Sequence, residues 1–435
     1  MEFSRLISVV GFVTILLIAW LLSVNKKVIN WRVIMWGIIL EILFASFIFL
    51  LPIGTQFFML VNDMVNGVLD SATYGIRFVF GRLGLAPGTV SESGETSIGF
   101  ILAFQAFPTI IFFAALVGVL YYYGIMQKLI RGFSYAFTKL MKISGAESLC
   151  ASSNIFVGVE SGLVIKPFLK NMTKSEICTV LTAGMATIAS SMLAVYIMML
   201  KNDFPSIAGH LVSASIMNAP AAIIISKLLC PETDTPETLG QDVKPQYEKE
   251  SNIFESIINN ANSGVKLVVG IAALLLAVLG LMTLGDKIIA LLGSQINSLL
   301  SVNVDWTLKG LLGYLFYPIT VIIGIPLNEA GEIAKIIGER LIVTEVTSFQ
   351  DLSVLTSSGL ISPRSVVITT YALTGFASVA SMAIFVGGFS AIAPDRVKDI
   401  SKLGFRALLG ATLATLLTSS LAGIFFSSSS ILMAQ

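Results

Sequence analysis

Two glutamates stand in short polar stretches of an otherwise apolar chain, and their chemistry is the first indication of function. Glu160 lies within Asn154–Gly162, and Glu345 lies within Leu341–Phe349. Both have small and apolar neighbours, so we expect both to be buried at membrane depth, where an ionisable residue marks a candidate site. Two carboxylates can exchange protons with a substrate, as in an enzyme. They can also accept hydrogen bonds from a bound polar solute.

Other side chains narrow this choice. His210 is the only histidine, which excludes a two-histidine metal site and a His-based catalytic pair. The cysteines Cys150, Cys178 and Cys230 have no paired spacing, so we expect buried thiols rather than a zinc site or a disulfide framework. We predict that His210 is a packed helix residue. Neither an Asp/Glu/His cluster nor a Gly-rich nucleotide motif accompanies the two acids. We therefore expect no catalytic residues and no cofactor, and an intramembrane enzyme is the weaker alternative.

A seven-residue repeat follows each acidic stretch. Gly184–Ser190 (Gly-Met-Ala-Thr-Ile-Ala-Ser) matches Gly375–Ser381 (Gly-Phe-Ala-Ser-Val-Ala-Ser). Small hydroxyl residues at the centre of an apolar span weaken the helix and can satisfy the freed backbone groups. Small residues also let membrane helices pack closely, which is the alternative explanation. Seven matched positions favour two interrupted helices.

The order of the predicted spans makes this repeat an inverted one. The two copies are separated by the spans at 176–199, 207–228 and 264–285, and an odd number of spans reverses the second copy. Inverted repeats whose interrupted helices meet near the bilayer midplane are typical of secondary transporters. A channel is a further alternative, although pores usually repeat subunits in one orientation. We predict a transporter of a small polar solute.

Membrane spans must position these residues. Of 435 residues, 55% are hydrophobic and 12% charged, whereas soluble proteins carry about 25% charged residues. The net charge of +1 gives no reason to expect a nucleic-acid partner. A spanning helix needs about 20 apolar residues. Eight runs qualify, near 4–23, 33–52, 98–123, 176–199, 207–228, 264–285, 364–393 and 403–427.

Positive charge predicts the orientation of the spans. Basic residues gather between the first two spans, between the third and fourth, and before the last. These connections share one side if the spans alternate, and the positive-inside rule makes that side the cytoplasm. Both termini then lie outside. Residues 286–363 are external in this scheme although they contain Lys287, Lys309, Lys335 and Arg340, and re-entrant structure would explain those charges.

The remaining segments complete the predicted fold. Residues 57–82 suit an amphipathic helix along the interface, and residues 228–252 are a polar, acidic, solvated loop without a site. Glu160 and Glu345 lie at the tips of two re-entrant hairpins. The fold class is an all-α polytopic membrane protein with eight transmembrane helices, two re-entrant hairpins in an inverted repeat and an interfacial amphipathic helix.

We divide the chain into four parts. The first is an N-terminal scaffold of spans and interfacial helix (1–97), and the second contains the third span to the fifth with the first hairpin (98–228). The third is a polar cytoplasmic loop with an amphipathic segment (229–263), and the fourth contains the sixth span to the eighth with the second hairpin (264–435).

Motifs in order along most of the chain resemble those of the concentrative nucleoside transporter family. Gly75–Gly81 is similar to its Gly-x-x-Phe-x-Phe-Gly, and Phe107–Phe113 with Tyr121–Gln127 is similar to its third-span signature. The leads into its two hairpins resemble Glu147–Leu149 with Asn154–Gly158, and Gly313–Pro318 with Gly324–Ala330. The resemblance implies a homotrimer in the plasma or bacterial inner membrane. It also implies that Na⁺ or protons drive nucleoside uptake into the cell. Symport of another small polar metabolite on the same fold is the alternative.

The resemblance also implies substrate contacts. Glu345 would accept hydrogen bonds from ribose hydroxyls, and Glu160 would face the base with help from Ser161. The full set is Val159, Glu160, Ser161, Met192, Glu345, Phe376, Ser378 and Ser381. The chain departs from the family where Gly158-Val159-Glu160-Ser161 lacks a glutamine, and where Thr344 and Ser378 replace asparagines. The base-reading hairpin is therefore the more divergent half.

A cation site is implied at the first hairpin. Asn154 stands four residues before Gly158, where sodium-coupled members carry an asparagine. The implied Na⁺ ligands are the Asn154 amide oxygen, the Thr187 hydroxyl and the carbonyls of Val157 and Ile188. Two alternatives remain: Asn154 caps a hairpin arm by bonding free backbone amides, or protons replace Na⁺ and bind Glu160 or Glu345.

Overall fold

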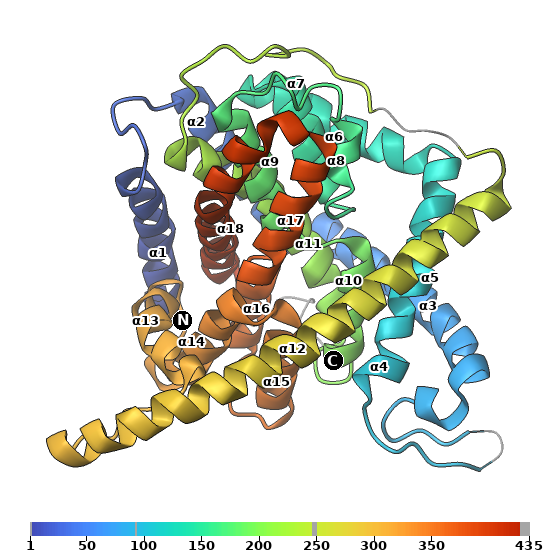
Figure 1. The fold of residues 1–435 in the computed structure, drawn as a ribbon, viewed down its shortest axis with the longest axis vertical. Helices are drawn as coiled ribbons and strands as arrows, with labels where there is room; N and C mark the ends of the chain where they lie inside the picture. The colour runs from blue at the N-terminus through green and yellow to red at the C-terminus, as the bar shows by residue number, and fades with distance from the viewer. Residues whose placement is uncertain (1, 92–93, 246–249, 427–435) are drawn as a thin grey trace.

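The computed structural model describes residues 2–91, 94–245 and 250–426, and over these ranges the regular structure is helical apart from two isolated β-bridges (Figure 1). The end of the last predicted span, at 427, and residues 246–249 of the predicted polar loop lie outside the described residues. In chain order the α-helices are α1 (Glu2–Leu21), α2 (Trp31–Phe49), α3 (Pro52–Phe80), α4 (Leu102–Gln105), α5 (Phe107–Tyr122), α6 (Ile125–Met141), α7 (Gly145–Asn154), α8 (Ser161–Val164), α9 (Lys174–Ala186), α10 (Ser190–Leu200), α11 (Ile207–Leu229), α12 (Ile253–Leu300), α13 (Leu308–Ile322), α14 (Leu327–Ile342), α15 (Glu345–Ser357), α16 (Pro363–Leu373), α17 (Val379–Ile392) and α18 (Val397–Phe425), with 3₁₀ turns η1 (Gly81–Gly84) and η2 (Pro394–Arg396).

The predicted polytopic membrane architecture is confirmed. Seven segments of the described chain are long and apolar enough to cross a bilayer. They are Phe3–Leu21, Trp31–Phe49, Leu102–Tyr122, Lys174–Leu200, Ile207–Leu229, Ile253–Leu299 and Pro394–Phe425. The eighth predicted span, at 364–393, is the pair α16 and α17, which a break divides into two shorter helices, of which α17 is apolar.

The predicted inverted repeat organises these helices. The first copy runs α5, α6, the hairpin α7–α8, the broken span α9–α10, and α11. The second runs α12, α13, the hairpin α14–α15, the broken span α16–α17, and α18. The copies are in contact where α5 packs against α12 and where α9 and α11 pack against α18. The centre of the molecule is therefore formed by both copies.

Helix α12 is much longer than the predicted span at 264–285. Its 48 residues correspond to about 70 Å, more than twice the roughly 30 Å hydrocarbon core. Figure 1 shows it crossing the molecule diagonally. The predicted span did not include the polar first turns of α12, because they are not part of the apolar run. In these turns Asn260 lies directly against Gly118 of α5, and α12 approaches α5 again at Gly264. Small residues at these points allow the close helix contact.

Helix α3 has the amphipathic character predicted for residues 57–82. Its buried face includes Phe58, Asn62, Leu69 and Ile76 at helical spacing, whereas other apolar side chains of α3 are exposed. The buried face packs against α11, where the Gly209 backbone N–H donates to Asn62 Oδ1 at 3.2 Å.

Two of the four basic residues of 286–363 that disagreed with the orientation rule, Lys309 and Arg340, are compensated inside the fold. Lys309 pairs with Glu339 at 2.8 Å and with Asp351. Arg340 is buried and donates to the Ala372 carbonyl and to Thr415 Oγ1. Because these two charges are compensated within the fold, they do not act as free loop charges in the positive-inside rule, whereas Lys287 is exposed on α12.

The connections predicted to be cytoplasmic lie together. Figure 1 shows the α1–α2, α11–α12 and α17–α18 connections at its upper end, near α6 and α7. The polar segment after α11 is more than a solvated loop: Glu232 approaches the buried Lys227 at 3.2 Å, and Thr238 pairs with Ser144 at 2.8 Å. Lys227 also pairs with the buried Glu147 at 2.9 Å and donates to Ser175 at 3.0 Å. This cluster joins α7, α9, α11 and the loop.

Replacing Lys227 by Met should destabilise the protein strongly, because Glu147 would be left as an unpaired buried charge. Removing one partner of a buried ion pair costs about 3–5 kcal/mol, whereas apolar replacement of both partners is often neutral. We therefore expect Lys227→Met to lower the unfolding temperature in mild detergent and a second change, Glu147→Met, to restore most of it. Lys170→Met is the matched control, since Lys170 is 75% exposed and lies 3.8 Å from an exposed aspartate. Equal effects of Lys227→Met and Lys170→Met would contradict the buried pair.

Candidate substrate and cation site

The repeated heptapeptides lie at the two helix breaks. The first copy ends α9 at Ala186 and starts α10 at Ser190, and Thr187 between them has extended backbone. The second copy follows the end of α16 at Leu373, and α17 starts at Val379. Ser378 caps α17 by accepting from the Ser381 backbone N–H at 3.2 Å. The two interrupted spans predicted from the repeat are therefore present.

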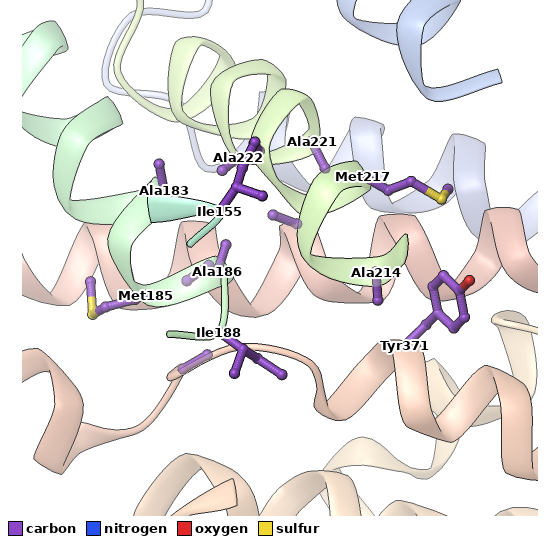
Figure 2. Packing of buried hydrophobic residues seen from close by; sticks show 14 of the residues in the cluster. Ile155, Ala183, Met185, Ala186, Ile188, Ala214, Met217, Ala221, Ala222 and Tyr371 are labelled. Carbon is purple, nitrogen blue, oxygen red and sulfur yellow. The ribbon is translucent and has the colours of Figure 1, made fainter. Parts of the chain in front are cut away.

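Glycine is required at the second break. Gly375 has a φ of +135°, and a Cβ atom there would lie 2.6 Å from the Ala186 carbonyl oxygen of the first break. The two breaks are thus in direct contact, with α11 beside them. Figure 2 shows this packing, with Ala186 and Ile188 of the first break near Ala214, Met217, Ala221 and Ala222 of α11.

The first hairpin meets the first break. The backbone N–H and the hydroxyl of Ser190 donate to the Phe156 carbonyl at 3.0 and 2.6 Å. The implied cation ligands Asn154, Val157, Thr187 and Ile188 therefore lie on two segments that touch. Thr187 Oγ1 donates to the Ala183 carbonyl at 2.9 Å, which leaves its lone pairs available to a cation.

Asn154 is fully buried as the last residue of α7. Its Nδ2 donates to the Cys150 carbonyl at 3.0 Å, and within the described chain its Oδ1 has no hydrogen-bond partner. The alternative that Asn154 caps free backbone amides is therefore wrong, because the amide donates to a carbonyl of its own helix. A buried amide oxygen without a partner is what a cation ligand requires before the cation binds.

Glu345 lies at the first residue of α15, at the tip of the second hairpin, and is buried as predicted. Tyr196 of α10 donates its hydroxyl to Glu345 Oε1 at 2.7 Å, and the Tyr196 ring stacks on Phe349 with centroids 4.3 Å apart. Glu345 Oε2 accepts no hydrogen bond from the described residues. The carboxylate is thus fixed through one oxygen while the other is available.

Two residues near Glu345 were not predicted from the sequence. Tyr196 lies inside an apolar span, where one aromatic residue gives no signal of function. Arg340 of α14 was counted among the loop charges, but its buried guanidinium donates to the Ala372 carbonyl, at the end of α16, and so joins the hairpin to the second broken span.

Glu160 differs from the expectation. It lies in the turn before the four-residue helix α8 and is exposed, not buried. Glu345, in contrast, is buried, so the two acids do not lie in equivalent environments.

The other predicted substrate residues lie on the first hairpin, on α10 and around the start of α17. Val159 packs on Gly388 of α17, and Ser161 is buried next to Cys150, whose Sγ lies 3.6 Å from its hydroxyl. Met192 is buried on α10, and Phe376 is half-buried beside the second break. The hydroxyls of Ser378 and Ser381 are 2.8 Å apart. Helix α17 contacts both α8 and α14, so it connects the two hairpins.

The remaining side-chain predictions agree with the structure. All three cysteines are free and buried, and His210 is packed within α11 between aromatic rings. The described residues contain no group of three or more His, Cys, Asp or Glu side chains that could hold a metal. The two side chains of the implied cation site, Asn154 and Thr187, carry neutral oxygens, which suits a monovalent cation.

Three family models match consecutive parts of the chain. They are described as the Na⁺-dependent nucleoside transporter N-terminus (residues 10–83), nucleoside recognition (103–203) and the Na⁺-dependent nucleoside transporter C-terminus (210–423). Together they cover most of both repeat copies.

Similar proteins come from bacteria and mammals. The chain is 36% identical to an uncharacterized transporter of Haemophilus influenzae, over 97% of this chain and 98% of that protein. It is 33% identical to the nucleoside permease NupC of Helicobacter pylori, over 98% and 99%. It is 34% identical to solute carrier family 28 member 3 of the mouse, over 97% of this chain and 59% of that protein.

Solved structures show the same fold. An inward-facing, substrate-bound structure of CNTnw superposes with a TM-score of 0.85 at 31% identity, covering 97% of this chain and 98% of that one. An outward-facing CNTnw variant gives 0.87 at 31% identity, covering 98% and 99%. The resemblance inferred from the motifs is thus confirmed, and the chain belongs to the family of Na⁺-dependent, concentrative nucleoside transporters.

Proposed function

We propose that this protein imports nucleosides together with Na⁺, with the cation at the first hairpin and the ribose at the second. The family consists of cation-coupled nucleoside symporters, so the protein is an integral membrane transporter and not an enzyme. One observation carries the assignment of residues. Each hairpin presents a buried side-chain oxygen without a hydrogen-bond partner in the described chain, Asn154 Oδ1 in the first and Glu345 Oε2 in the second.

The first of these oxygens suits Na⁺. In transporters with broken helices, the coupling cation is bound by backbone carbonyls of the unwound segments and by the C-terminal ends of the half-helices. Thr187 follows the end of α9, where the helix dipole is negative. Asn154 Oδ1, Thr187 Oγ1 and the carbonyls of Val157 and Ile188 would form this ligand set. A neutral set favours Na⁺ over a proton, which needs a basic group to bind.

The second oxygen suits a sugar hydroxyl. Glu345 is held by Tyr196 through Oε1, so Oε2 can accept from ribose without a change of rotamer. Phe376, Ser378 and Ser381 at the start of α17 would contact the same sugar. A substrate lacking these hydroxyls would leave a buried carboxylate oxygen unpaired, which is the strongest basis for rejecting an analogue.

The base would lie toward the first hairpin. Glu160 is exposed in the α7–α8 turn, next to Val159 and Ser161, and Met192 lies on α10. A carboxylate accepts hydrogen bonds but cannot donate them, unlike the family's glutamine amide. We therefore expect this hairpin to prefer bases that present N–H donors.

Replacing Asn154 by Ser should abolish stimulation of uptake by Na⁺. The serine side chain is shorter, so its hydroxyl would not reach the position of the buried Asn154 amide oxygen. The measurement is nucleoside uptake at fixed pH with Na⁺ or choline, in the wild type and the variant. Asn171→Ser is the control, since Asn171 is an exposed asparagine that bonds Glu237. Wild-type uptake that ignores Na⁺ but rises with an inward proton gradient would refute the sodium assignment.

Replacing Glu345 by Gln should weaken uptake of uridine and adenosine by about 10- to 100-fold, the loss expected for a hydrogen bond to a charged group. The effect on 2′- and 3′-deoxynucleosides should be smaller, because they make fewer of these bonds. Tyr196→Phe should give a smaller loss of the same kind, and Tyr314→Phe, at an exposed tyrosine, should give none. Labelled uptake in transporter-deficient cells is the assay. Equal transport of ribonucleosides and deoxynucleosides by the wild type would contradict the ribose assignment.

A homotrimer is the association state that the family resemblance implies. Most of α12 is exposed in the single chain, with large apolar side chains such as Leu276 and Leu291. These side chains must face lipid or another copy of the chain. Mass measurement in mild detergent should give three copies, and a stable monomer would count against the trimer.

A further inference from the structure

Asn218 of α11 lies where the two helix breaks meet. Its side chain is fully buried, and its Nδ2 donates to the Ala186 carbonyl and to the Thr374 carbonyl, each at 2.8 Å. Ala186 is the last residue of α9, and Thr374 is the C-cap of α16. One amide group therefore serves the C-terminal carbonyls of both interrupted helices.

Such carbonyls have no partner within their own helices. In an apolar environment an unsatisfied carbonyl costs several kcal/mol, so each needs an external donor. A side-chain amide has two N–H bonds and can serve two acceptors at once. The orientation of this amide follows from chemistry, because the flipped form would place Asn218 Oδ1 against two carbonyl oxygens.

The two carbonyls belong to different parts of the proposed site. Ala186 immediately precedes Thr187 and Ile188, which we assign to the cation. Thr374 lies two residues before Phe376 and four before Ser378, which we assign to the substrate. The breaks also touch directly at Gly375. A shift of either break would therefore change the hydrogen bonds that Asn218 makes to the other.

We propose that Asn218 is a positioning residue that couples occupation of the cation site to the affinity of the substrate site. This inference rests on the proposed Na⁺–nucleoside symport. Coupling between two sites is reciprocal and needs an element whose arrangement both ligands affect. The two hydrogen bonds of Asn218, one to each break, make it that element, and Asn218 is not among the residues that we assign to either ligand.

The test measures coupling rather than activity. Binding of labelled uridine and adenosine to the purified full-length protein is titrated without Na⁺ and with saturating Na⁺, and the ratio of the two Kd values is the coupling factor. Asn218→Leu removes both donors at similar volume, and Asn218→Ser keeps a single donor. Ser226→Ala is the matched control, since Ser226 is buried on the same helix but bonds Thr179 and its own helix, away from the breaks.

We expect Asn218→Leu to reduce the coupling factor about tenfold, the size of one or two lost hydrogen bonds, with uridine affinity in the absence of Na⁺ changed only a few-fold. Asn218→Ser should show a smaller reduction, and Ser226→Ala none. If the leucine variant does not fold, the serine variant decides the question. An unchanged coupling factor in the Asn218 variants, whatever happens to affinity, would overturn the inference and leave the proposed symport intact. If Na⁺ does not change the nucleoside affinity of the wild type, both this inference and the proposed symport are overturned.

Discussion

Backbone groups released where a helix is interrupted must find partners inside the fold, because the surrounding membrane offers none. This constraint fixes the centre of the molecule. The carbonyls of Ala186 and Thr374 are served by Asn218, and that of Phe156 by Ser190. Each bond joins an interrupted segment to a different element, so the breaks, the first hairpin and α11 hold one another in place.

The same constraint governs the buried cations. Arg364 at the start of α16 donates to the carbonyls of Gly324, Gly423 and Ser4, and Arg340 donates to that of Ala372. Gly423 lies in the last turn of α18, and Ala372 lies in the last turn of α16. Helix C-termini carry partial negative charge, so these guanidinium groups are compensated by the backbone as well as by hydrogen bonding.

This arrangement separates two kinds of oxygen. The first hairpin and the first break contribute neutral donors, whereas the second hairpin contributes a carboxylate held by Tyr196. Neutral oxygens suit a weakly held monovalent ion, and a carboxylate suits hydroxyl donors. The contact of Gly375 with the Ala186 carbonyl joins the two breaks, so a shift of one break can affect the other.

The sequence determined the class of the protein and the position of its breaks. Composition and apolar runs are sufficient to predict spans, because lipid exposure demands them over a whole helix. The repeat Gly184–Ser190 and Gly375–Ser381 located both breaks, since helix-weakening residues act locally. Only the tertiary structure showed that Glu160 is exposed, that α12 extends from Ile253 to Leu300, and that Tyr196, Arg340 and Asn218 bond Glu345 and the ends of the broken helices. Their partners are 32 to 156 residues away along the chain. Hydrogen bonds at such separations depend on how helices pack, and no local pattern of residues encodes them.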